Sequence, residues 1–232
     1  DDTQNMLDMA SPSTPKNVAD HKVGDKSLSL TAQFVQLPYR VADSDELSVA
    51  MWVKWNTSTT QWQRIFDFGN DEDHYLFLTP NSGTSKMRFA IKNGGDEQIL
   101  DCPSKLSSYL WKHVVVTMGK DKTAIYVDGT EVASTTGITI KPSDIRPVLN
   151  YLGRSQYTAD PNISANYDDV RIFNYALSAD EVKAVKDGTY TNIQSVENSD
   201  VVSKPIYTID GKRIDRPQQG INIIDSRKIL MK

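Results

Sequence analysis

The chain has 232 residues, of which 38% are hydrophobic and 24% are charged, and this balance supports a buried core and excludes a wholly disordered protein. The 26 basic and 30 acidic residues give a net charge of -4, so we expect no nucleic-acid partner, which would require a basic face. No apolar run approaches the about 20 residues that a membrane-spanning helix needs, and we expect no transmembrane segment. The single cysteine, Cys102, excludes an internal disulfide framework.

Residues 1–18 are rich in Ser, Thr and Pro, and we interpret them as a leader or linker. The first residues are polar and do not form an export signal. Two interpretations follow from this start: a cytosolic protein, or an exported one whose signal peptide has been removed.

From residue 27 onward, strand patterns recur about every ten residues, with Gly, Asn, Asp or Ser between them. In the longest, residues 47–55, we expect Val49, Met51, Val53 and Trp55 to share one face because side chains alternate along a strand. Further strands are expected at residues 27–30, 34–38, 64–68, 75–79, 87–92, 113–118, 123–128, 148–153 and 170–174. This spacing predicts an all-β fold, an antiparallel sandwich or barrel.

Two local signals mark turns and ends. Asp128-Gly129 predicts a tight hairpin, because that turn needs positive φ at both central residues. Ser178 and Glu181 form a capping-box pattern that predicts one short helix, ended by Gly188.

The expected organisation has four parts. After the leader comes a sandwich at residues 19–188, then a polar linker at 189–204 and a small β-rich module at 205–232, with a hairpin about Asp210-Gly211. Residues 204–232 carry seven basic and three acidic side chains, a net +4 against -8 for the remainder. That reversal of charge supports a separate module.

Seven segments occur in the order typical of a known family: residues 27–37, 47–54, 65–70, 111–117, 125–129, 151–154 and 168–178. The chain resembles the laminin-G-like group of concanavalin A-like lectin/glucanase domains over about residues 20–187. The resemblance implies an antiparallel jelly-roll β-sandwich, with Trp52 and Trp111 at framework positions in its core.

Residues 206–230 resemble the C-terminal sorting-type modules of exported Bacteroidetes proteins, in the segments 206–214, 220–224 and 228–230. The resemblance implies a secreted, periplasmic or cell-surface protein whose signal peptide has been removed.

Catalysis is not expected. In the glycosidases of this superfamily the carboxylates follow a Glu-x-Asp-x-x-Glu pattern on one strand, and the chain lacks that pattern. The acidic cluster at residues 71–73 is interpreted as a solvated turn. The three histidines, His21, His74 and His113, lie in separate segments without zinc-ligand spacing. We therefore name no catalytic residue.

Calcium is the one ion for which the resemblance provides ligands. In related sandwiches the aspartate that opens the late Asp-x-Val-Arg strand binds calcium with oxygens of an N-terminal loop. Here these residues are Asp168 with Asp25 and Gly24 in the loop at residues 20–25, and the site would be structural. The alternative left open is that Asp168 caps the loop or pairs with an arginine.

Sugar binding needs exposed aromatic rings that stack on pyranose faces and polar side chains that bind hydroxyls. We name Trp62, Tyr75 and Tyr157 as candidate stacking residues and Asp71 as a candidate polar contact. The leading hypothesis is recognition of a polysaccharide or glycan without cleavage. The alternatives are an adhesion or spacer module that binds an envelope protein, and a glycoside hydrolase with an unrecognised site.

Overall fold

The computed structural model describes residues 15–39 and 41–191 and the backbone of residues 206–208, 213–214, 220–224 and 227–231. The chain divides into two compact units, Asp1–Lys186 and Asp187–Lys232. In the first unit, side chains are described for residues 15–39 and 41–186.

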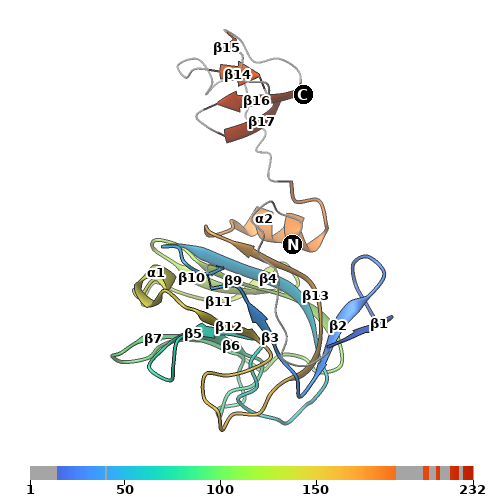
Figure 1. Ribbon diagram of the computed structural model, residues 1–232, viewed down its shortest axis with the longest axis vertical. Helices are drawn as coiled ribbons and strands as arrows, with labels where there is room; N and C mark the ends of the chain where they lie inside the picture. Colours follow the sequence, from blue (N-terminus) through green and yellow to red (C-terminus); the bar gives the residue numbers. More distant parts are fainter. Residues whose placement is uncertain are drawn as a thin grey trace. The chain divides into compact units, whose positions relative to one another are not determined.

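The first unit is a sandwich of two antiparallel sheets (Figure 1). The seven-stranded sheet has the order β1 (Lys16–Val18), β2 (Ser27–Thr31), β13 (Ser164–Phe173), β4 (Leu47–Trp55), β9 (Trp111–Met118), β10 (Thr123–Val127) and β11 (Thr130–Thr135). The six-stranded sheet has the order β3 (Val35–Leu37), β12 (Leu149–Leu152), β5 (Phe66–Gly69), β6 (His74–Thr79), β7 (Arg88–Asn93) and β8 (Gln98–Asp101). The predicted all-β, antiparallel jelly-roll sandwich is confirmed.

The core lies between the two sheets and follows from the alternation of side chains. Val49, Met51, Val53 and Trp55 of β4 are all at most 1% exposed and belong to one apolar cluster, so the predicted inward face is confirmed. From β6 of the opposite sheet, Leu76 and Leu78 enter the same cluster. Tyr75 and Phe77, which alternate with these leucines on β6, point to the other side of the sheet, which we call the outer face of the six-stranded sheet.

The local turn and cap signals are confirmed. Asp128 and Gly129 have φ values of 53° and 83° between β10 and β11. The Ser178 backbone N–H donates to Glu181 Oε2 at 2.8 Å, and the Glu181 N–H donates back to Ser178 Oγ at 3.3 Å. This capping box opens α2 (Ala179–Lys186).

Other features differ from the sequence-based expectation. Residues 16–18, placed in the leader, form the edge strand β1, while β8 and the single turn α1 (Pro142–Ile145) were not predicted. Trp52 is not in the core: it lies half-buried on the outer side of the seven-stranded sheet, with Lys22 Nζ 4.7 Å from its ring centre. Trp111 is also half-buried, and its indole N–H donates to Asp20 Oδ1.

The two described helices have four and eight residues, too short to cross a bilayer, so no membrane-spanning helix occurs in the described part of the chain.

The second unit contains a four-stranded antiparallel sheet in the order β15 (Arg213–Ile214), β14 (Ile206–Thr208), β16 (Gly220–Ile224) and β17 (Arg227–Met231). These strands agree with the expected β-rich character of residues 205–232. Residues 210–211, expected at a hairpin turn, and most of residues 1–18 and 189–204 lie outside the described residues.

Candidate functional site

The outer face of the six-stranded sheet carries a second, small apolar cluster. It consists of Tyr75 and Phe77 on β6 and Ala90 on β7, with Trp62 and Tyr157 packed against it. Tyr75 and Phe77 lie here because Leu76 and Leu78 take the core side of the same strand. Period-two alternation therefore places two aromatic rings side by side on a face that the core does not need.

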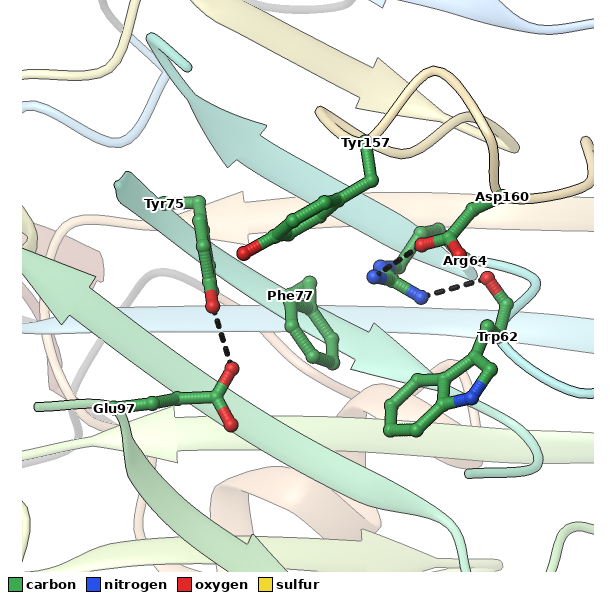
Figure 2. Close-up of a pocket in the computed structure, with 7 residues that line it drawn as sticks. All are labelled: Trp62, Arg64, Tyr75, Phe77, Glu97, Tyr157 and Asp160. Atoms are coloured by element: carbon green, nitrogen blue, oxygen red, sulfur yellow. Dashed lines mark hydrogen bonds and ion pairs between the residues drawn. The ribbon is translucent and has the colours of Figure 1, made fainter. Parts of the chain in front are cut away.

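A pocket of about 230 Å³ opens over this cluster (Figure 2). Its lining residues are Trp62, Arg64, Tyr75, Phe77, Glu97, Tyr157 and Asp160. The strand β6 provides the floor, and three connections provide the walls: the segment before β5, the turn before β8 and the loop between β12 and β13. Four of the seven residues are aromatic.

Arg64 organises one side of the pocket. Its side chain is 2% exposed, and the guanidinium donates to Trp62 O at 2.6 Å, to Asp160 Oδ2 at 2.8 Å and to Asp67 Oδ2 at 3.2 Å. The guanidinium also lies over Phe77, with Cζ 3.9 Å from the ring centre. A single buried cation thus holds a backbone carbonyl, a pocket carboxylate and an aromatic floor in one arrangement (Figure 2).

Asp67 lies under the pocket as the buried partner of Arg64. Its carboxylate is 1% exposed, and burial raises its pKa from 3.8 to about 7 against the opposing effect of Arg64 and the Gln156 N–H. Its Oδ1 atom is buried without a hydrogen-bond partner among the described residues. This carboxyl group supports the pocket but does not line it.

Trp62 is held in a conformation that side chains rarely adopt. Its φ is 61°, in the left-handed region, and its N–H donates to Asn81 O at 2.9 Å. The indole lies directly against Gly83, where an added Cβ would be 3.1 Å from Trp62 Cζ2. A half-buried indole fixed in this way presents a ring surface to the pocket.

The opposite side of the pocket is formed by two tyrosines and Glu97. Tyr75 OH donates to Glu97 Oε1 at 2.6 Å, and burial together with this carboxylate raises the pKa of Tyr75 well above its ordinary value. Tyr157 meets Tyr75 edge to face at 5.8 Å and donates its own OH to Glu72 O at 2.9 Å. Both hydroxyls are therefore fixed as donors within the protein.

Three of the four predicted ligand-binding residues, Trp62, Tyr75 and Tyr157, come together in this pocket, although they come from three separate segments. Asp71 does not line it: Asp71 Oδ1 accepts from the Asp73 N–H and from His74 Nδ1, as expected for a solvated turn. Sequence reasoning missed the other four: Arg64, Phe77, Glu97 and Asp160. Strand alternation from Tyr75 would have found Phe77, whereas the other three have no local signal.

The predicted calcium residues show a different arrangement. Asp168 Oδ2 accepts the backbone N–H groups of Lys22 at 2.6 Å and Val23 at 2.9 Å, next to Gly24 with its φ of 65°. A calcium ion needs oxygen ligands, whereas this loop turns N–H donors toward the carboxylate, so the geometry does not fit an ion bound at Oδ2. Asp168 here caps the loop, and calcium with Asp25 stays a prediction.

No cluster of three or more His, Cys, Asp or Glu side chains suited to a metal ion occurs within the described residues.

Comparison with known proteins identifies the superfamily to which the sandwich belongs. Residues 30–183 match a model of the concanavalin A-like lectin/glucanases superfamily. No curated protein matches the chain in sequence.

Three solved structures illustrate the similarity. Domain 4 of AbnA, a GH43 extracellular arabinanase from Geobacillus stearothermophilus, in complex with arabinotriose, has a TM-score of 0.67 at 21% identity over 78% of this chain and 87% of that one. The CBM40 of Ruminococcus gnavus IT-sialidase, bound to α2,3 sialyllactose, has a TM-score of 0.53 at 22% identity over 63% of this chain and 85% of that one. The binding domain of botulinum neurotoxin serotype C1 has a TM-score of 0.59 at 13% identity, over 94% of this chain and 61% of that one. At these identities the likeness concerns the fold.

Proposed function

The chain belongs to the concanavalin A-like lectin/glucanases superfamily, and from this premise we propose that its sandwich is a non-catalytic carbohydrate-binding module. The observation that carries the proposal is the aromatic pocket on the outer face of the six-stranded sheet. Two structural neighbours were solved with sugars bound, arabinotriose and α2,3 sialyllactose, which supports a glycan as the partner of this fold.

The composition of the pocket suits a sugar. Aromatic rings stack on the apolar faces of pyranose and furanose rings, and the partly exposed Trp62 and Tyr157 offer such surfaces. Tyr75, predicted as a stacking residue, and Phe77 are 3% and 2% exposed, so they form the floor of the pocket. Glu97 and Asp160 add carboxylate oxygens at the edge, which accept hydrogen bonds from hydroxyls. A volume of about 230 Å³ is small among ligand pockets and suits one or two sugar units of a chain.

The position of Asp67 supports binding rather than cleavage. A glycosidase needs a protonated carboxyl group within reach of the glycosidic oxygen. Asp67 has the raised pKa of such a group, about 7, but it is 1% exposed and is covered by Arg64 and the pocket floor. A general acid in that place would not touch the substrate.

A second candidate is an adhesion module that binds a protein at the cell envelope. Tyr109 and Leu110 are adjacent and each 58% exposed, and such neighbouring apolar side chains occur at protein contacts. Capture of one envelope protein by the wild-type chain, lost on Tyr109→Ser, would favour this candidate.

We also propose an exported protein, secreted, periplasmic or on the cell surface, and this part rests on the resemblance of residues 206–230 to sorting-type modules. Fractionation of cells that express the chain with and without residues 205–232 tests it: loss of export on truncation is expected, and unchanged export would contradict it.

The experiment that tests sugar binding is an array of plant, host and microbial glycans probed with the purified full chain. Trp62→Ala is the test variant, and Tyr109→Ala is its matched control, because Tyr109 is also a loop aromatic with positive φ, 62° against 61°, but lies outside the pocket. We expect binding that Trp62→Ala weakens at least about tenfold and Tyr109→Ala leaves unchanged. An array without any signal would overturn the proposal.

A further inference from the structure

The polar groups of the pocket are unequal in what they can offer a ligand. Apart from the indole N–H of Trp62, its side-chain donors belong to Arg64, Tyr75 and Tyr157, and each of these three is engaged within the protein. Arg64 donates to Trp62 O, Asp160 and Asp67. Tyr75 donates to Glu97, and Tyr157 donates to Glu72 O. A ligand that requires hydrogen-bond donors from these three side chains would have to break existing bonds.

Acceptors, in contrast, are available. Glu97 uses Oε1 for Tyr75, and Asp160 uses Oδ2 for Arg64 and Ser155. Within the described residues, Glu97 Oε2 and Asp160 Oδ1 have no hydrogen-bond partner. Figure 2 shows the Glu97 carboxylate on one side of the aromatic rings and Asp160 with Arg64 on the other. Two carboxylate oxygens therefore face a ligand that donates.

The charge of the lining residues also favours a ligand without a negative charge. Its lining contains one cation, Arg64, and two carboxylates. The cations at its margin are also paired: Arg88 binds both oxygens of Asp101, at 2.7 and 3.1 Å, and Lys92 Nζ lies 2.6 Å from Asp73 Oδ1. Arg154, stacked on Phe34 and Tyr151, is not among the lining residues.

We infer that this pocket selects uncharged sugars, which enter as hydrogen-bond donors, and rejects sugars that carry a carboxylate, with Glu97 as the residue that sets the choice. A uronic or sialic acid would bring its carboxylate into a site of the same charge and would find no unpaired arginine or lysine among the lining residues. The inference rests on the proposed function, because it names the class of sugar for that same pocket.

The test uses pairs of oligosaccharides that differ in their carboxylates: galactotriose against trigalacturonate, and lactose against α2,3-sialyllactose. Isothermal titration of the full chain gives the affinity for each member. We expect the neutral member of a bound pair to bind at least about tenfold more tightly than the acidic one.

Two variants separate a local effect from net charge. Glu97→Gln keeps an oxygen that accepts from Tyr75 and removes the charge, so we expect the neutral-to-acidic ratio to fall to about threefold or less. Asp96→Asn is the matched control: Asp96 is the preceding residue, exposed and outside the pocket, and its substitution removes one charge from the same turn. The ratio is expected to stay unchanged in Asp96→Asn.

The outcomes distinguish this inference from the proposed function. Acidic sugars that bind as tightly as their neutral partners would overturn the inference and leave carbohydrate binding intact. An equal fall in the ratio for both variants would overturn the role of Glu97. Absence of binding to every sugar here and on the glycan array would overturn the proposed function, and the inference with it.

Discussion

Arg64 Nη1 donates a hydrogen bond to the backbone carbonyl oxygen of Trp62 at 2.6 Å, so a buried cation fixes the backbone of the residue that forms one wall of the pocket. The same guanidinium holds Asp160, which comes from the loop between β12 and β13. The shape of the pocket therefore depends on an ion pair network beneath its surface as much as on the aromatic rings that line it.

Loss of Arg64 should cost stability as well as binding. In Arg64→Met, Asp67 keeps its buried place but loses its cation, and we expect the free energy of unfolding to fall by about 3 kcal/mol. In Arg64→Met/Asp67→Asn no buried carboxylate is left, so the double variant should recover part of that loss. Urea unfolding of the wild type, Arg64→Met, Asp67→Asn and the double variant measures the coupling. Additive effects would mean that the two residues do not stabilise each other.

Gly83→Ala should weaken sugar binding without unfolding the protein. The new Cβ would lie 3.1 Å from Trp62 Cζ2, so the indole must move by a few tenths of an ångström. We expect affinity for the sugar found on the array to fall severalfold, with an unchanged melting temperature. Gly95→Ala is the control, because a Cβ there meets nothing within 4 Å. Equal affinities for both variants would argue against Trp62 as a wall of the binding site.

Asp67 should make the protein less stable as the pH rises. Its pKa is about 7 in the folded chain and 3.8 when unperturbed, so between these values the folded protein holds a proton that the unfolded chain has lost. Its contribution is complete below about pH 4 and is lost as the pH approaches about 7. The wild-type advantage over Asp67→Asn should shrink across this range in urea titrations. A difference that does not vary with pH would refute this.

His113, in contrast, should make the protein less stable as the pH falls. Its ring is 0% exposed, neither ring nitrogen has a partner among the described residues, and burial lowers its pKa from 6.5 to about 4. Its contribution is complete above about pH 6.5 and is lost as the pH falls through about 4, because the unfolded chain then binds the proton more tightly. We expect His113→Leu to be more stable than wild type at pH 5 by about 1 kcal/mol, an increase of about 2–4 °C in melting temperature. A lower melting temperature would show that the imidazole has a favourable partner.

Asp168 should stabilise the sandwich through the loop that it caps. Asp168→Asn weakens two charge-assisted hydrogen bonds from Lys22 and Val23, and we expect a loss of about 1–2 kcal/mol. The wild-type melting temperature in millimolar calcium and in chelator tests the calcium prediction, and equal values would contradict it. A rise in calcium that Asp25→Asn abolishes would instead establish the predicted calcium site.

Local rules were sufficient for much of the fold. The inward face of β4, the turn at Asp128-Gly129 and the capping box at Ser178 all depend on residues within a few positions of one another. The strand β8 was missed because in Gln98–Asp101 only Ile99 and Leu100 are apolar, and they are adjacent instead of alternating. Trp52 was assigned to the core by family resemblance, although it alternates with Met51 and Val53, which are buried.

The residues of the candidate site were likewise predictable only in part from the sequence. The sequence alone identified Trp62, Tyr75 and Tyr157 as candidate aromatic residues of a sugar site. Only the tertiary structure shows that these three residues surround one pocket and that Asp71 lies outside it. It also shows that Arg64 pairs with both Asp67 and Asp160. The physical reason is that antiparallel pairing brings together loops that lie up to about a hundred residues apart, and no local periodicity encodes which loops will meet.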